Sequence, residues 1–129
     1  MEVYVPPDPP PPDEPPHVAY AVKHLVNGIW VDGNELVVWG FTNQATTHSF
    51  KLFVNDRPVD AVWTTQFVPL PGGDSSGNLP AISATPDRIT FSDGATKVPD
   101  GGYIIVARRL VSGMPLETKA YGRLVYTSP

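Results

Sequence analysis

From residue 18 onward, short runs of apolar and β-branched residues alternate with clusters of glycine, proline, asparagine and aspartate. Runs bounded in this way, without the 3.6-residue repeat of an amphipathic helix, are typical of β-strands. Roughly seven or eight such runs follow one another, the number found in small sandwich domains. The pattern therefore predicts an all-β domain, a small antiparallel β-sandwich of immunoglobulin-like or jelly-roll type, with a barrel as the alternative.

The first pair of runs, between residues 25 and 41, is expected to form a hairpin. Its turn is placed at Asp32-Gly33-Asn34, because Asp-Gly and Gly-Asn pairs tolerate the positive φ angles that a tight hairpin needs. Later runs predict strands near 81–84, 88–92, 103–111 and 118–126, the last two paired antiparallel, with a long loop over residues 68–80.

A second hairpin is expected around Asp56 and Arg57, taken as its loop. Pro58 lies directly after the loop, where a missing N–H costs little. The register that follows places apolar residues on one face of the hairpin, as a strand packed on a core requires. The expected cross-strand partners are Val54 and Val59, Leu52 and Ala61, and Phe50 and Trp63.

Two runs, 36–41 and 103–106, are apolar in both alternating phases. An antiparallel strand with one solvated face should instead alternate between apolar and polar residues. Either another part of the chain covers the outer face of these strands, or another protein does. For the second case, the domain residues expected at the contact are Trp39, Phe41 and, on the long loop, Leu70.

The first 17 residues differ in composition from the domain predicted over 18–129. Half of the 16 prolines lie within residues 1–16, and such a segment forms neither a helix nor a paired strand. It is expected to be an extended polyproline II arm, in which residues 5–16 would span about 37 Å at roughly 3.1 Å per residue. The arm residues expected to bind a partner are the apolar tip Val3, Tyr4 and Val5 and the run Pro9, Pro10, Pro11 and Pro12.

Two other interpretations of the arm stay open at this stage. The composition is also that of a disordered linker or a solubilising tail. The spacing of Pro9 and Pro12 fits a ligand for a proline-recognition domain, but no Arg or Lys flanks the prolines, whereas most such grooves favour a basic neighbour.

The net charge of −4 is concentrated in the arm. Of the 13 acidic residues, four lie within residues 1–16, which leaves nine acidic against nine basic residues in the remainder. A neutral domain with an acidic arm lacks the basic surface expected of a protein that binds nucleic acid or an anionic membrane. The first residues, Met1 to Tyr4, show no secretory signal pattern, and no apolar run approaches the roughly 20 residues that span a bilayer.

Candidate chemistry is sparse. The chain has no Cys, and His17, His24 and His48 lack the spacing of a zinc site. The segment Gly73–Gly77 is a turn-rich loop rather than a nucleophile motif, and Asp93-Gly94 is an ordinary turn dipeptide rather than part of a calcium loop. No catalytic residue, cofactor site or metal site is therefore expected.

These observations favour a non-enzymatic structural protein of a large assembly, most plausibly a virus or phage capsid decoration (cement) or minor virion protein. Its β-domain would dock on the assembly and its arm would clamp a neighbouring subunit, so the expected partners are protein subunits, including further copies of the chain, and the expected location is the virion. The alternative is an immunoglobulin-like or carbohydrate-binding module of an adhesin or surface protein, with Trp30, Trp39 and Trp63 as candidate sugar-stacking residues.

Overall fold

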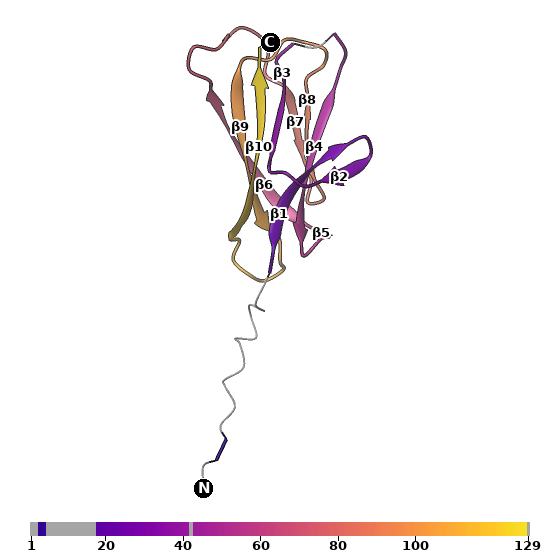
Figure 1. Ribbon diagram of the computed structural model, residues 1–129, viewed down its shortest axis with the longest axis vertical. Coiled ribbons are helices and arrows are strands. Elements are labelled where there is room, and N and C mark those ends of the chain that lie inside the picture. The colour runs from indigo at the N-terminus through magenta and orange to yellow at the C-terminus, as the bar shows by residue number, and fades with distance from the viewer. Residues whose placement is uncertain (1–2, 5–17, 42, 129) are drawn as a thin grey trace.

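The fold is a sandwich of two β-sheets, seen in Figure 1 as two layers of strands running along the length of the domain. The computed structural model describes residues 3–4, 18–41 and 43–128. The six-stranded sheet contains β1 Tyr20–Val26, β2 Ile29–Val31, β4 Thr47–Val54, β5 Arg57–Val59, β7 Ala81–Ala84 and β8 Ile89–Ser92. The four-stranded sheet contains β3 Glu35–Trp39, β6 Ala61–Pro69, β9 Gly101–Arg109 and β10 Thr118–Thr127.

The strand order is that of an immunoglobulin-type sandwich. In the first sheet it is β2-β1-β4-β8-β7, with β5 paired to β4, and in the second it is β3-β10-β9-β6. Without β2, β3 and β5, the first, second, fifth and fourth strands face the third, sixth and seventh, as in immunoglobulin domains. The predicted β-sandwich is therefore confirmed. One pairing departs from the antiparallel expectation, because β3 runs parallel to β10.

The core lies between the two sheets and is rich in aromatic rings. Phe91 stands at its centre, with its ring centroid 5.1 Å from that of Tyr103 and 6.0 Å from that of Phe50. Tilted and edge-on ring pairs of this kind add to the stabilisation from burial alone. The largest fully buried side chains are Tyr126, Phe50, Phe91, Leu52, Ile89, Ile105, Leu124, Val22 and Val98.

The first hairpin turns earlier than the sequence pattern predicted. The turn lies at Asn27-Gly28, where φ is 50° and 82°, as a two-residue type I′ turn requires. It joins β1 to β2, with Leu25 opposite Trp30. The predicted turn at 32–34 is wrong: that segment carries the chain from the six-stranded sheet into β3 of the other sheet.

The second hairpin turns at Asn55-Asp56, one residue before the predicted loop, with φ of 48° and 65°. Leu52 therefore pairs with Val59 and not with Ala61. Because the register differs by two residues, the side chains of the hairpin keep their predicted faces. Ala61 and Trp63 are also buried, as predicted, but in a different sheet. Their predicted strand partners are wrong, because both residues belong to β6 in the opposite sheet.

The remaining predicted elements are found where the sequence placed them. β7 covers the predicted range 81–84, and β9 and β10 pair antiparallel. The long loop between β6 and β7 is held by specific bonds. The carboxylate of Asp100 accepts hydrogen bonds from the backbone N–H of Asp74 (3.1 Å) and from Ser128 Oγ (2.9 Å), and the Asn78 N–H donates to the Lys97 carbonyl (2.8 Å).

Candidate interaction surface

The outer face of the four-stranded sheet exposes large apolar side chains, and it is called the apolar face below. Trp39 is 62 % exposed, Tyr121 58 % and Val37 55 %. Large exposed apolar patches on monomeric domains are typical of contact surfaces, so this face is a candidate interaction surface. The exposed members of the apolar face are Val37, Trp39, Val68, Ile104 and Tyr121.

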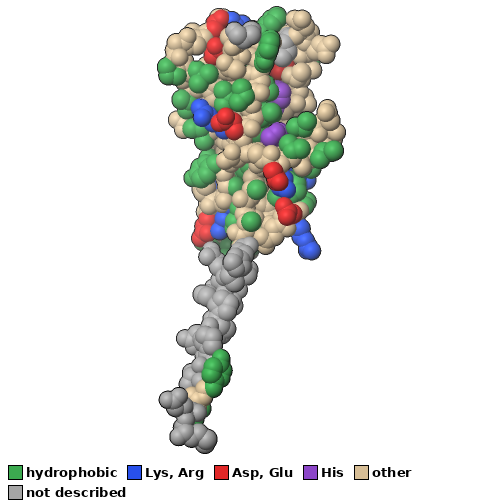
Figure 2. Space-filling model, in the orientation of Figure 1, with side chains coloured by type: hydrophobic (Ala, Val, Ile, Leu, Met, Phe, Trp, Pro, Cys, Tyr) green, Lys and Arg blue, Asp and Glu red, His purple; other side chains and the backbone are tan. Residues whose placement is uncertain are grey.

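The strand register makes these residues neighbours. Val37 pairs with Val125, Val125 with Gly102, and Gly102 with Val68, so one apolar row crosses all four strands. Tyr121 lies opposite Val106 in a second row. In Figure 2, hydrophobic side chains recur along the length of the domain, whereas charged side chains stand in small groups of mixed sign.

One ion pair lies on the apolar face. Arg123 Nη1 lies 3.7 Å from Glu35 Oε2, and both side chains are about half exposed. The Arg123 side chain crosses above Gly102, where an added Cβ would lie 3.0 Å from Arg123 Nε. Ile104 is the cross-strand neighbour of Arg123. The ion pair neutralises the two charges beside Ile104, whereas Arg108, exposed on the same face of β9, adds one positive charge toward the other end of the strand.

The three domain residues predicted at a contact lie at one end of this sheet. Trp39 is the last residue of β3. Phe41 lies two residues after it and is 55 % exposed. Leu70 is half-buried and lies just after β6, at the opposite edge of the same sheet, with its N–H bonded to the Asp100 carbonyl (3.2 Å). The structure thus brings Trp39 and Phe41 together with Val37, and leaves Leu70 across the sheet from them.

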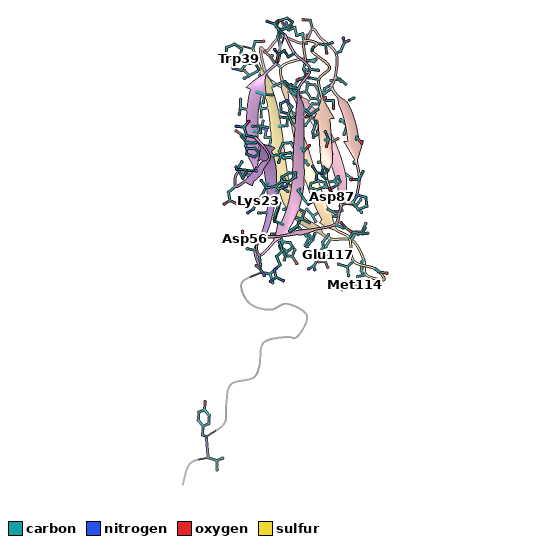
Figure 3. The ribbon with its side chains drawn as sticks, turned by 90° about the vertical axis from the view of Figure 1, so that its right-hand side faces the viewer. Lys23, Trp39, Asp56, Asp87, Met114 and Glu117 are labelled. Carbon is teal, nitrogen blue, oxygen red and sulfur yellow. The ribbon has the colours of Figure 1, made fainter. Side chains whose placement is uncertain are left out.

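Trp39 lies at the end of the domain opposite the start of β1. Figure 3 shows Trp39 at one end and Asp56, Glu117 and Met114 at the other. The Asn55 N–H donates to the Ala19 carbonyl (2.9 Å), which fixes the beginning of the domain beside the β4–β5 turn. A segment that precedes residue 18 therefore joins the domain far from Trp39.

Of the predicted arm residues, only Val3 and Tyr4 are described. They are 82 % and 81 % exposed, so neither side chain is packed against the sandwich. The predictions for Val5, Pro9, Pro10, Pro11 and Pro12 fall outside the described residues.

The outer face of the six-stranded sheet has a different chemistry, which sequence reasoning missed. Lys23 Nζ lies 4.8 Å from the centre of the Phe53 ring and 3.1 Å from Asp32 Oδ1. Hydrogen bonds that Lys23 donates to the carboxylates of Asp32 and then Asp56 raise the pKa of Lys23. The ring of Trp30 lies 6.2 Å from Phe53 and is flanked by further cations. This face pairs its charges internally and places cations over its aromatic rings.

Two kinds of feature are absent from the described residues. Within them, no three His, Asp or Glu side chains are grouped to bind a metal ion. The described part of the chain also has no helix long and apolar enough to cross a membrane.

Comparison with known proteins gives no relative. No family model matches the chain, and no curated protein and no solved structure matches it. A function can therefore be inferred only from the structure itself, and its most informative feature is the apolar face.

A partly buried histidine and a buried aspartate, His48 and Asp93, lie close together beside Tyr126 of the core. His48 Nε2 lies 3.7 Å from Asp93 Oδ2, and the His48 ring meets the Tyr126 ring edge-on at 6.0 Å. Burial lowers the pKa of His48 although Asp93 opposes the shift. Burial acts to raise the pKa of Asp93, but hydrogen bonds from Thr46 and the Ala95 N–H outweigh it and leave the pKa lowered.

These shifts predict acid-sensitive stability. Because the folded-state pKa of His48 lies below 6.5, the folded protein binds fewer protons than the unfolded chain, and stability falls as the pH drops below 6.5. The free energy of unfolding, measured in urea from pH 8 to pH 5, should decline by at most about 1.4 kcal/mol per pH unit. His48→Gln should flatten this decline, and an unchanged slope in the variant would contradict the assignment. Asp93, with a pKa below 3.8, adds a second loss at still lower pH.

Proposed function

We propose that the chain is a non-enzymatic structural protein of a large assembly, of the kind that decorates or cements a virus or phage capsid. The observation that carries the proposal is the exposed apolar face of the four-stranded sheet, with Trp39 at 62 % and Tyr121 at 58 % exposure. Aromatic residues that stand in an apolar surrounding supply most of the binding energy in many protein interfaces.

The proposed arm contact is the second half of this function. Val3 and Tyr4 are apolar, exposed and separated from the domain by residues 5–17, which include eight prolines. If that connection is extended, as its prolines predict, its 13 residues span roughly 40 Å. The tip then reaches a subunit other than the one under the apolar face, and the arm gains affinity because its contact becomes intramolecular once the domain has docked.

Deletion of residues 1–16 tests this function. The truncated domain should unfold at the same temperature as the full chain, because the described tip residues do not pack on the sandwich. Its binding to the assembly purified from the native source, measured by co-sedimentation, should weaken by roughly 100-fold, since one of two linked contacts is lost. The full-length variant Val3→Ser/Tyr4→Ser separates the anchoring tip from the rest of the arm and should lose most of the same affinity.

Two outcomes would overturn the proposal. Undiminished binding of the truncated protein would remove the arm from the function. The exposed Trp39 and Tyr121 also suit a sugar-stacking platform, so saturable quenching of tryptophan fluorescence by a glycan, lost in Trp39→Ala, would support a carbohydrate-binding module instead.

A further inference from the structure

The outer edge of β6 has unused backbone hydrogen-bonding groups. β6 is the last strand of its sheet and pairs only with β9. The Leu110 N–H donates to the Asp60 carbonyl (3.1 Å) and the Leu70 N–H to the Asp100 carbonyl (3.2 Å). These two bonds show that the backbone N–H and C=O groups of the even-numbered residues in this strand point toward β9. In an antiparallel pair, successive residues direct these groups to alternate sides of the strand.

The backbone N–H and C=O groups of the odd-numbered residues therefore point away from β9, toward the open edge of the sheet. The Ala61 N–H confirms this, since it donates to the Pro86 carbonyl (2.8 Å), outside the sheet. Beyond Ala61, no described strand pairs with this edge. The residues that present free N–H and C=O groups there are Trp63, Thr65 and Phe67.

The edge also lacks the features by which proteins block unwanted pairing. Natural edge strands are interrupted by lysine, proline or a bulge. From Ala61 to Val68 the strand contains no charged residue and no proline, and its nine-residue register with β9 has no irregularity. Pro69 ends the strand, where the missing N–H limits any added pairing to the residues before it.

The sequence of β6 is nearly palindromic about Thr65. When the strand is laid antiparallel on itself with Thr65 opposite Thr65, side chains of the same kind meet. On the core side, Trp63 meets Phe67. On the outer side, Val62 meets Val68 and Thr64 meets Gln66.

We propose that the chain forms a symmetric dimer in which β6 pairs antiparallel with β6 of a second copy, with Thr65 on the two-fold axis. This register places Trp63, Thr65 and Phe67 of each copy in the hydrogen-bonding positions, and these are the residues whose groups are free. A two-fold contact brings each surface against itself, so a strand without charges meets no like-charge repulsion. The two four-stranded sheets become one continuous sheet.

A second copy suits this edge better than an unrelated strand, because its sequence matches the hydrogen-bonding parity and at the same time places side chains of the same kind opposite each other. One pair of edge strands gives less contact than the roughly 800 Å² per partner of a standard interface. The dimer is therefore expected to dissociate on dilution, with a Kd of about 10⁻⁶ to 10⁻³ M. The inference does not depend on the proposed assembly function.

Sedimentation equilibrium of the full chain over a concentration series tests the dimer. The wild-type mass should rise from 14.0 kDa toward twice that value. Thr64→Lys/Gln66→Lys places lysines opposite each other across the axis, and like charges in directly opposed positions destabilise the pairing. This variant should remain at 14.0 kDa. The matched control Thr64→Glu/Gln66→Lys places the new carboxylate of each copy opposite the new ammonium group of the other copy and should dimerise as the wild type does.

Amide hydrogen exchange locates the contact. As the concentration rises, the amides of Thr65 and Phe67 should become protected, whereas those of Thr64 and Gln66 should be protected throughout because they bond to β9. A wild-type chain that stays at 14.0 kDa up to about 10⁻³ M would overturn the proposal. So would a dimer that persists in the double-lysine variant, because it would use another surface.

Discussion

Ile104→Glu is expected to weaken binding to the assembly by roughly 30-fold or more, because a residue at the centre of an apolar contact contributes about 2 kcal/mol or more. Ile104 lies in the middle of β9 on the apolar face, between Arg123 and Gln66 on the neighbouring strands, and is 36 % exposed. A carboxylate there would lose its hydration when an apolar partner covers the face, and this desolvation costs binding free energy even though Arg123 lies opposite it. Co-sedimentation with the purified assembly gives the affinity.

The matched control is Ile29→Glu on β2, an isoleucine that is 65 % exposed on the edge strand of the six-stranded sheet. It should leave the affinity unchanged. Both variants should keep the unfolding temperature within a few degrees, since exposed substitutions away from the core change stability by about 1 kcal/mol or less. Equal losses of affinity in the two variants, or no loss in either, would show that the apolar face is not the docking surface.

How far the sequence predicts this fold depends on whether a signal is local. Alternation in 118–126 defined β10 correctly, because this strand has one buried face. The strand predicted at 81–84 is also found, as β7, although all four of its residues are exposed. The turns were harder, since both Asn27-Gly28 and the Asp-Gly pair at 32–33 carry turn chemistry. Which of the two segments forms the hairpin turn depends on a contact distant in sequence, because residues from Glu35 onward pair with β10, beginning with Arg123. No local pattern contains that pairing.

The candidate site shows the same division. The run 36–41 is apolar in both phases, which left open whether the chain itself or another protein covers its outer face. Val37 and Trp39 are exposed, so no described part of the chain covers them. Tyr121 was not predicted, although it sits in a regular alternation, because its position on the apolar face follows from the pairing of β10 with both β3 and β9. The free edge of β6 was also beyond reach, since the expected hairpin partner of this strand was β4, whereas its only partner among the described strands is β9.

Phe50→Ala is expected to cost about 3–5 kcal/mol of stability, because removing a buried phenylalanine side chain loses its transfer free energy and leaves a cavity. Phe50 is 0 % exposed, and its ring lies 6.0 Å from the Phe91 ring and 6.2 Å from the His24 ring. Small domains have a total stability of only about 5–15 kcal/mol. The unfolding temperature should therefore fall by roughly 10–20 °C, which thermal unfolding followed by circular dichroism measures directly.

Phe41→Ala is the control that separates the core from the proposed docking surface. Phe41 is 55 % exposed, so its truncation should cost less than about 1 kcal/mol of stability while it reduces binding to the assembly. The same substitution is thus expected to have different effects at the two positions. Phe50→Ala should lower the stability of the domain, whereas Phe41→Ala should lower its affinity for the assembly. A loss of stability in Phe41→Ala as large as that in Phe50→Ala would mean that Phe41 supports the sandwich itself, and the case for a docking surface at this end of the sheet would fail.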